Sequence, residues 1–231
     1  MSRRATVAAG AALGVGLGLA GTRTAHAEPV RRDPFLLGVA SGDPLPDAVV
    51  LWTRLVADPF DAAAMGRRTV PVEWEMSADE RFSAVVRRGT AAARPELAHS
   101  VHVDVRGLRP GRVYWYRFRA GGHVSPTGRT RTAPEAYSRP NRFRVGVVNC
   151  QDWQNGYWPA YLGLAAEDLD VVVHLGDYIY EYDPSSAYPD RLHTAPQTVG
   201  LDQLVTLGDY RARHAQYKTD PALQRAHAAF P

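Results

Sequence analysis

The sequence predicts an α+β protein with two domains, an all-β sandwich followed by a strand–helix–strand unit. Three observations lead to this prediction. Between residues 33 and 137, several short runs alternate apolar and polar residues, as half-buried strands do. Residues 132–141 (TAPEAYSRPN) contain two prolines and little apolar pattern, which is typical of a linker. Two apolar runs then flank a helix-like segment, which indicates a βαβ unit.

The first predicted domain spans residues 33–137. We expect its strands at residues 49–52, 70–77, 100–105 and 113–120. In the last of these, Tyr114, Tyr116 and Phe118 share one face because successive side chains of a strand alternate. Several short strands with turn signals between them predict a sandwich of the immunoglobulin or fibronectin type III kind.

The second predicted domain spans residues 141–231. Its two apolar runs, residues 143–148 and 169–175, predict buried strands. Polar residues follow both runs, with Cys150 after the first and Asp177 after the second. Ligands of such sheets bind outside the carboxyl ends of the strands. We therefore expect Cys150 and Asp177 to face one crevice if the two strands are neighbours.

Three helices are expected in the second domain. The crossover helix should cover residues 157–167 and bury Tyr161, Leu164 and Ala165. The next helix should cover residues 198–217, with an apolar face made of Leu201, Leu204, Val205 and Tyr210. Asp220 and Pro221 suit the cap and the first turn of a last short helix.

Two stretches carry a family resemblance. The sequence GDYIYEY at residues 176–182, together with Asn-Cys-Gln at the end of the preceding strand, resembles the PhoD-type alkaline phosphatases. These are a branch of the calcineurin-like metallophosphoesterases. GVASGDP at residues 38–44 and LWTR at residues 51–54 resemble the amino-terminal domain of the same family. The resemblance implies that residues 141–231 form the first part of an α/β metallophosphoesterase sandwich, and that the chain is an amino-terminal portion.

The resemblance also implies a set of metal ligands. Cys150 and Tyr180 would bind Fe³⁺, and Asp177 would bridge this ion to a second metal, Ca²⁺. Thiolate with phenolate favours a transition metal over a hard cation. A carboxylate shared by two metals also positions the attacking water, which makes Asp177 the candidate catalytic residue. Asn149 and Asp152 are close enough along the chain to orient water or ligands, as a second rank.

Each of these residues also has a structural reading. Asp177 follows Gly176, and Asp after Gly is commonly a turn or cap residue. Cys150, the only cysteine, would alternatively be a buried inert thiol. Tyr180 would be one more aromatic residue of a tyrosine-rich loop. His174 lies inside the second apolar run, where a satisfied core histidine is more common than a metal ligand.

The remaining aromatic and histidine residues are expected to be structural. Tyr178 and Tyr182 are expected to be packing aromatics. Of the other histidines, three show no ligand spacing and are expected on the surface: His193, His214 and His227.

The implied function is a secreted, metal-dependent alkaline phosphatase or phosphodiesterase that releases phosphate from esters for phosphate scavenging. The sequence leaves monoesters and diesters open as substrates. A two-metal site takes about five or six protein ligands, and this chain offers three. We therefore expect the chain alone to hydrolyse phosphate esters negligibly. The alternative is a secreted β-sandwich binding module with a non-catalytic appendage.

Residues 1–27 have the pattern of an export signal. Arg3 and Arg4 precede an apolar run rich in Ala and Gly, and Ala25-His26-Ala27 is a cleavage site. The paired arginines favour twin-arginine export, with Sec export left open. The run is too short and glycine-rich for a permanent membrane span. The segment holds three of the 27 basic residues and no acid, so the remainder carries 24 charges of each sign. A stable nucleic-acid partner is therefore not indicated.

We predict that residues 1–27 are removed on export and that the mature chain begins at Glu28. Mass spectrometry of the exported protein checks the cleavage, and an intact Met1 end would contradict it. Changing Arg3 and Arg4 together to Lys should block export if the twin-arginine route is used. Unchanged export of this variant would point to the Sec route instead.

Overall fold

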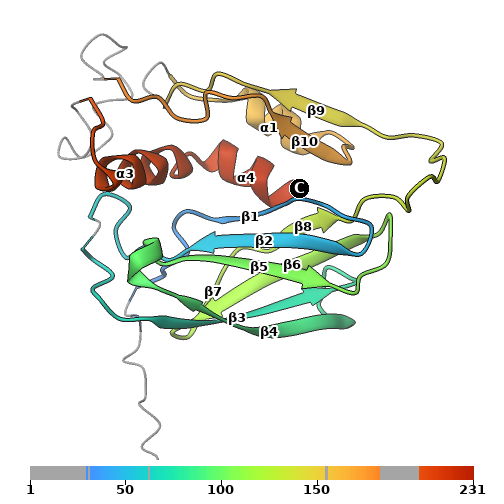
Figure 1. The fold of residues 1–231 in the computed structure, drawn as a ribbon, viewed down its shortest axis with the longest axis horizontal. Coiled ribbons are helices and arrows are strands. Elements are labelled where there is room, and N and C mark those ends of the chain that lie inside the picture. Colours follow the sequence, from blue (N-terminus) through green and yellow to red (C-terminus); the bar gives the residue numbers. More distant parts are fainter. Residues whose placement is uncertain (1–29, 31, 62, 154–155, 183–202) are drawn as a thin grey trace, which may run out of the picture.

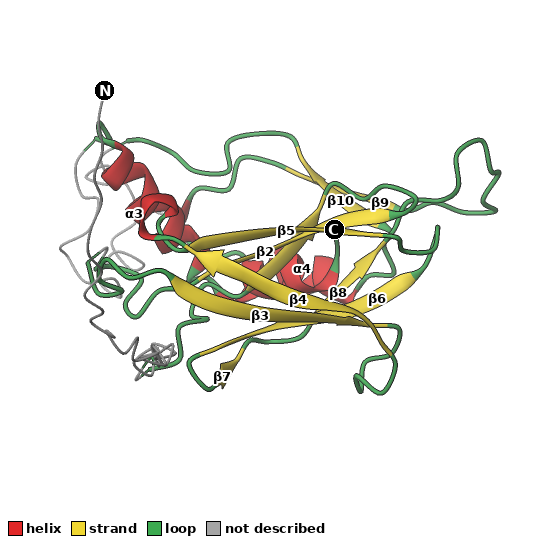
Figure 2. Cartoon of the chain, turned by 60° about the horizontal axis from the view of Figure 1, so that its bottom comes forward, coloured by secondary structure: helices red, strands yellow, loops and turns green. Residues whose placement is uncertain are grey.

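The computed structural model describes residues 30, 32–61, 63–153, 156–182 and 203–231. Two antiparallel sheets form its first part (Figures 1 and 2). One sheet has the order β1 (Val39–Gly42), β2 (Ala48–Arg54) and β5 (Ser100–Arg106). The other has the order β4 (Val85–Ala93), β3 (Val70–Ser77), β6 (Val113–Ala120) and β7 (His123–Val124), with β8 (Gly128–Arg131) also paired to β6. A short 3-10 helix, η1 (Pro95–Leu97), precedes β5.

The core of this part lies between the two sheets. Along β6, every second residue is buried, so Tyr114, Tyr116 and Phe118 point inward as predicted. Residues of β2, β3 and β5 contribute Leu51, Val72, Met76 and Val103 to the same cluster, among others. All four strands predicted from the alternating pattern are confirmed.

Strand β4 was not predicted, because its sequence VVRRGTAAA has neither alternation nor large apolar residues. The structure gives the reason for its composition. Gly89 pairs with Trp74 across the sheet, and a Cβ at Gly89 would lie 2.8 Å from the indole ring. Gly89 therefore leaves room for the Trp74 ring. At this position the apolar side chain comes from β3 and not from β4.

The second part begins with the predicted βαβ unit: β9 (Val145–Val148), α1 (Ala160–Ala166) and β10 (Val171–His174). The two strands pair in parallel, with Val145 opposite Val171. Helix α1 lies over the side of the sheet where Gly146 faces Leu164, and Tyr161 of α1 is buried as expected. The expected helix start at 157 is wrong, because α1 begins only after Pro159.

The prediction that both strands are buried is wrong for the described residues. Val145, Val147 and Val173 are exposed, and Val147 is 59% exposed. Only the face toward α1 and α4 is covered within the part of the chain that the structure describes. An apolar run therefore identified the strands correctly but overstated their burial.

Helix α3 (Leu207–Lys218) covers the carboxyl-terminal part of the predicted helix at residues 198–217. Residues 203–206 are not helical, and residues 198–202 lie outside the described residues. Helix α3 begins at a capping box, in which the Thr206 side chain accepts from the Asp209 N–H and Asp209 accepts from the Thr206 N–H. The predicted apolar face is only partly right. Leu204 is buried, but Val205 and Tyr210 are exposed, and Leu201 lies outside the described residues. The buried positions of α3 are Arg213, Ala215, Gln216, Tyr217 and Lys218.

Helix α4 (Pro221–Ala229) begins as predicted, since the Asp220 carboxylate accepts from the N–H groups of Ala222 and Leu223. Figure 1 shows α3 and α4 as a layer between the sandwich and the βαβ unit. Helix α4 contacts α1 on one side and β1 and β8 on the other. The two parts of the chain are thus packed through this helix. No helix among the described residues is long and apolar enough to cross a membrane.

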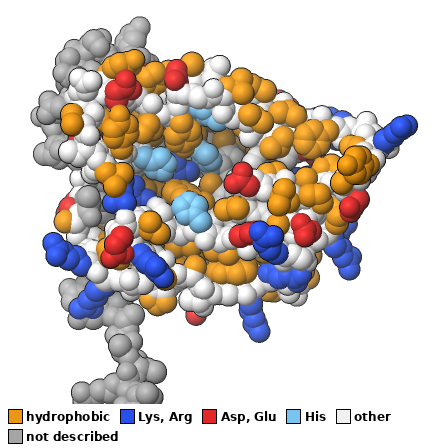
Figure 3. Space-filling model, in the orientation of Figure 1, with side chains coloured by type: hydrophobic (Ala, Val, Ile, Leu, Met, Phe, Trp, Pro, Cys, Tyr) orange, Lys and Arg blue, Asp and Glu red, His pale blue; other side chains and the backbone are white. Residues whose placement is uncertain are grey.

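Two of the three histidines expected on the surface lie instead in this layer, and His193 is outside the described residues. The His214 ring stacks on Tyr178 with centroids 5.9 Å apart and also meets Trp52 of β2. The His227 Nε2 lies 2.9 Å from the Tyr178 hydroxyl. Figure 3 shows histidine and basic side chains gathered between the sandwich and the βαβ unit. Tyr178 is a packing aromatic, as predicted, and it is the residue around which these histidines pack.

Lys218 is buried in the same layer, with 2% of its surface exposed. Its ammonium lies 4.9 Å from the centre of the Trp52 ring. Burial lowers the pKa of Lys218 from 10.5 to about 7. The unfolded chain therefore takes up a proton on this lysine below pH 10.5, whereas the folded chain does so only below about pH 7. The free energy of unfolding should consequently rise with pH between these two values.

We predict that the free energy of unfolding increases by about 2 kcal/mol between pH 7 and pH 9, and that Lys218→Met removes most of this increase. Methionine keeps the length of the side chain without the proton. Urea unfolding at both pH values measures the effect. Arg225→Met, at an exposed cation of α4, is the matched control and should keep the wild-type pH dependence. A wild-type slope in Lys218→Met would contradict the prediction.

Candidate metal centre

The candidate site lies where β9 and β10 end. Backbone pairing continues past the ends of the two strands. The Cys150 N–H donates to the Gly176 carbonyl at 3.1 Å, and the Gln151 N–H donates to the Asp177 carbonyl at 3.2 Å. Cys150 and Asp177 both have left-handed backbones, with φ of 51° and 52°. Such a conformation costs a non-glycine residue about 1–3 kcal/mol and persists where the surroundings impose it. Gly176, with φ of 125°, occupies a region that suits glycine and allows the sharp exit from β10.

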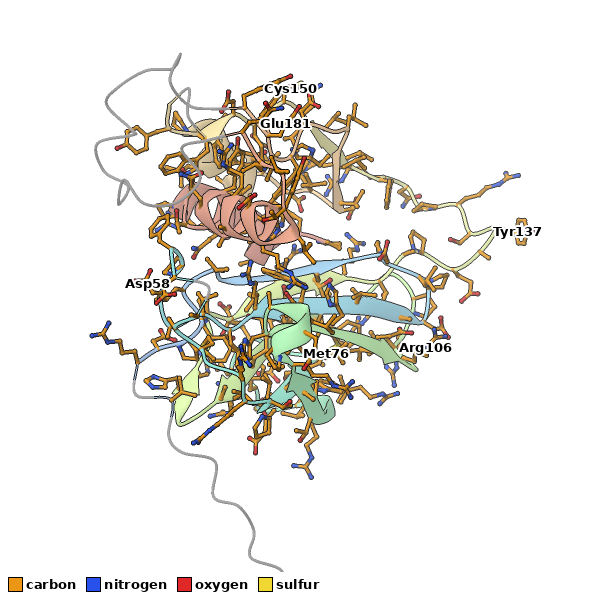
Figure 4. The ribbon with its side chains drawn as sticks, turned by 60° about the vertical axis from the view of Figure 1, so that its left-hand side comes forward. Asp58, Met76, Arg106, Tyr137, Cys150 and Glu181 are labelled. Carbon is orange, nitrogen blue, oxygen red and sulfur yellow. The ribbon has the colours of Figure 1, made fainter. Side chains whose placement is uncertain are left out.

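The structure brings Cys150, Asp177 and Tyr180 together. The Cys150 Sγ lies 3.4 Å from Oδ2 of Asp177, and the Tyr180 hydroxyl donates to the same oxygen at 3.1 Å. A thiol, a carboxylate and a phenol thus converge from two adjacent loops. Cys150 is exposed, so the alternative of a buried inert thiol is wrong. Figure 4 places Cys150 at the edge of the molecule opposite Met76 of the sandwich, where solvent reaches it.

The electrostatics of the cluster keep Tyr180 protonated. Partial burial and hydrogen bonds with Cys150 and Asp177 raise the pKa of Tyr180 above its ordinary value. The phenol therefore acts as a hydrogen-bond donor to the Asp177 carboxylate at neutral pH. Cys150 and Tyr180 thus share the Asp177 carboxylate through hydrogen bonds. A cation bound by the same three groups would displace the protons of these bonds.

Asn149 and Asp152, which were expected to orient water or ligands, differ in exposure and in their contacts. Asn149 is exposed and lies next to Cys150. Asp152 is partly buried, and its Oδ1 accepts a hydrogen bond from the Tyr217 hydroxyl at 3.4 Å. Its backbone carbonyl accepts from the Trp158 indole at 3.3 Å. Asp152 thus directs its carboxylate toward α3.

His174 supports the turn into Asp177. Its Nδ1 accepts from the Gly176 N–H at 3.3 Å, and its ring lies 5.1 Å from that of Tyr178. Burial lowers the pKa of His174, which favours the neutral ring, while the Asp177 charge opposes this shift. The expectation of a satisfied core histidine is half right, because Nε2 is buried without a hydrogen-bond partner among the described atoms.

Sequence reasoning missed the residues that support the cluster. Gln151 is buried, donates from Nε2 to the Tyr178 carbonyl at 2.9 Å and accepts from the Tyr161 hydroxyl at 2.5 Å. Arg213 and Tyr217 of α3 contact the loop that carries Tyr180. The sequence offered only a weak indication of this role. The spacing of four residues places Arg213 and Tyr217 on one face of the helix, but it does not show which segment that face contacts.

The donor chemistry fits a transition metal better than Ca²⁺. Thiolate and phenolate together suit a transition metal, and both meet the carboxylate of Asp177. Calcium takes six to eight oxygen ligands, and Asp177 is the only one of the three that supplies a carboxylate. The described residues hold no group of three or more His, Cys, Asp or Glu side chains that could bind a metal. Tyr180 is the third donor of the arrangement, beside Cys150 and Asp177.

Comparison with known proteins shows the family of the chain. Residues 21–134 match the family model for the PhoD-like phosphatase N-terminal domain, and residues 145–231 match the model for PhoD-like phosphatase. The chain belongs to the PhoD-like phosphatase family. The first match starts inside the segment predicted to be an export signal.

Two relatives of the PhoD-like family are similar to this chain over most of its length. Alkaline phosphatase D of Bacillus subtilis (strain 168) is 50% identical over 198 residues, which cover 86% of this chain and 34% of that protein. A solved structure of PhoD matches with a TM-score of 0.82 and 47% identity, covering 89% of this chain and 39% of that chain. The chain thus spans well under half the length of each of these two relatives.

We predict that the Cys150 thiol reacts fully with a thiol reagent in the folded chain, without denaturant, because its side chain is exposed. Counting modified thiols by absorbance and by mass measures this. Circular dichroism recorded in parallel confirms that the chain stays folded. A thiol that reacts only after urea is added would show that Cys150 is buried, contrary to the structure.

Proposed function

We propose that this chain provides part of the active centre of an exported, metal-dependent alkaline phosphatase or phosphodiesterase. The observation that carries the proposal is the convergence of Cys150, Asp177 and Tyr180 at the ends of two parallel strands. Membership of the PhoD-like family supports it, because both family models align with the chain and the second includes all three residues. The substrate would be a phosphate ester, and the role would be phosphate scavenging.

The proposed metals are Fe³⁺, held by Cys150, Asp177 and Tyr180, and Ca²⁺, shared through Asp177. When bound, they would neutralise phosphoryl charge and supply a water acidic enough to attack phosphorus. Asp177 meets both Cys150 and Tyr180 through Oδ2, so its carboxylate would be the group shared by the two cations. The exposure of Cys150 and Asp177 leaves the centre open to a substrate from solvent.

The residues of this chain contribute to the mechanism by positioning the groups that would bind the metals. The left-handed backbones at Cys150 and Asp177 bring their side chains to one point on adjacent loops. Tyr180 orients the Asp177 carboxylate through its hydroxyl. Such preorganisation removes the cost of arranging ligands and water when substrate arrives.

The wider assignments are part of the same proposal. We divide the chain into an export signal at residues 1–27, a sandwich domain of immunoglobulin or fibronectin type III kind at 33–137, and part of a metallophosphoesterase domain at 141–231. The protein would act outside the cytoplasm or in the cell envelope, after recognition by the export machinery. It would have no permanent membrane span and no stable nucleic-acid partner.

The alternative of a β-sandwich binding module has less support. A non-catalytic appendage has no need to bring a thiol and a phenol onto one carboxylate oxygen at the ends of two adjacent strands. The enzyme proposal explains this convergence, so we favour it.

The proposal is tested by placing residues 30–231 in Bacillus subtilis alkaline phosphatase D, in place of the matching segment, and assaying a phosphate monoester and a diester. Asp177→Asn should lower kcat by about a thousandfold or more, which corresponds to about 4 kcal/mol of transition-state stabilisation. Tyr180→Phe should bleach or shift the visible ferric–phenolate absorption, and Cys150→Ser should reduce iron content on dialysis.

Tyr182→Phe is the matched control, because the Tyr182 ring stacks on Tyr180 with centroids 5.9 Å apart and Tyr182 is not one of the three proposed ligands. It should keep colour, iron and activity. If the three site variants keep wild-type metal content and activity, the site residues are structural and the proposal is wrong.

A further inference from the structure

Two fully buried side chains of α3 reach the loop that carries Tyr180. Arg213 and Tyr217 lie one helical turn apart, and each has 0% of its surface exposed. Neither touches the thiol, carboxylate or phenol of the candidate site through a described hydrogen bond. Both instead bind the backbone of residues 180–182. Arg213 and Tyr217 are therefore placed to hold the backbone of this loop.

Arg213 satisfies carbonyl groups of the loop after Asp177. Its Nη1 donates to the Tyr180 carbonyl at 2.5 Å, and its Nη1 and Nη2 lie 3.3 and 3.4 Å from the Tyr182 carbonyl. Residues 178–182 belong to no helix or strand, so their carbonyls lack a regular backbone partner. The planar guanidinium can bind two acceptors in fixed directions, which a lysine ammonium does not reproduce.

Tyr217 connects the loops that follow the two strands. Its hydroxyl accepts the Tyr180 N–H at 3.3 Å and donates to Oδ1 of Asp152 at 3.4 Å. Asp152 is two residues beyond Cys150, and Tyr180 is three residues beyond Asp177. One hydroxyl therefore ties the loop of the candidate thiol ligand to the loop of the candidate phenol ligand.

Helix α3 is itself fixed at its other side. The capping box at Thr206 sets where it starts. Arg54 of β2 donates from Nη1 to the Arg211 carbonyl at 2.9 Å, and Arg211 donates from Nη2 to the Glu96 carbonyl at 2.5 Å. The helix is thus attached to the sandwich, so that Arg213 and Tyr217 extend from a rigid support.

We propose that Arg213 and Tyr217 are positioning residues of the metal centre, which hold the Tyr180 loop so that its hydroxyl stays on Asp177. This inference rests on the proposed function for its metal, but the holding of the loop does not. Residues that orient ligands from behind typically change metal affinity 10–100-fold when they are mutated. A residue that only stabilised the fold would change the melting temperature instead.

The test uses the full chain and the variants Tyr217→Phe and Arg213→Lys, each a conservative change. Tyr210→Phe on the same helix and Arg225→Lys at an exposed position of α4 are the matched controls, since neither side chain contacts residues 178–182 in the described hydrogen bonds. Hydrogen exchange of the metal-free chain, followed by mass spectrometry of peptides covering residues 177–182, reports the loop. Titration with Fe³⁺, followed by the ferric–phenolate absorption, reports the centre.

We expect exchange at the Tyr180 amide to be at least about tenfold faster in Tyr217→Phe, because its acceptor is lost, with unchanged exchange in β3 and α4. We expect Fe³⁺ affinity to fall about tenfold in both positioning variants and to stay unchanged in both controls. Melting temperatures should stay within a few degrees of wild type, which separates positioning from loss of the fold.

The outcomes separate the two proposals. If wild type binds Fe³⁺ with the phenolate colour but neither variant changes exchange or affinity, the positioning role is overturned and the proposed function stands. If wild type shows no ferric–phenolate colour while Tyr217→Phe still loosens the loop, the metal assignment fails and the holding role stands. Equal losses in variants and controls would also overturn the positioning role.

Discussion

The parallel pairing of β9 with β10 is the interaction on which the candidate site depends. Because the strands run side by side in the same direction, their ends lie at one edge and their following residues meet. The pairing continues for two hydrogen bonds beyond the strands, which fixes Cys150 against Gly176 and Gln151 against Asp177. A shift of one residue in this register would separate the thiol from the carboxylate.

The helical layer carries the next level of support. Helix α4 packs on α1 and on the sandwich, and α3 holds the loop after Asp177. Lys218 is buried in this layer, with its ammonium 4.9 Å from the centre of the Trp52 ring. The sandwich therefore acts as a foundation for the helices and, through them, for the candidate site.

Much of this arrangement could be predicted from sequence. The alternation in β3, β5 and β6 is a direct consequence of a half-buried strand, and Asp220-Pro221 is a local signal for a helix start. The apolar strands placed Cys150 and Asp177 at one sheet edge, whereas the family resemblance supplied the ligand roles of Cys150, Asp177 and Tyr180. The predictions that failed depend on distant contacts. Strand β4 shows no apolar alternation, because Trp74 of the neighbouring strand packs where a side chain at Gly89 would lie. The histidines of α3 and α4 pack against Tyr178, which is more than 30 residues away in the sequence. The buried face of α3 was missed for a related reason, since Arg213 and Lys218 look like surface residues until their partners are known.

The linker has a consequence for how the two parts stay together. Tyr137 projects from it fully exposed, and the backbone from residue 133 to 144 forms no strand or helix (Figure 4). Attachment comes instead from α4 on β1 and β8, together with Arg129 donating to the Ala229 carbonyl at 3.2 Å. Covalent continuity and physical association are therefore separate properties of this chain. A chain nicked at the linker would persist as a non-covalent pair of fragments, with the sandwich still docked beneath the helices that support the strand ends.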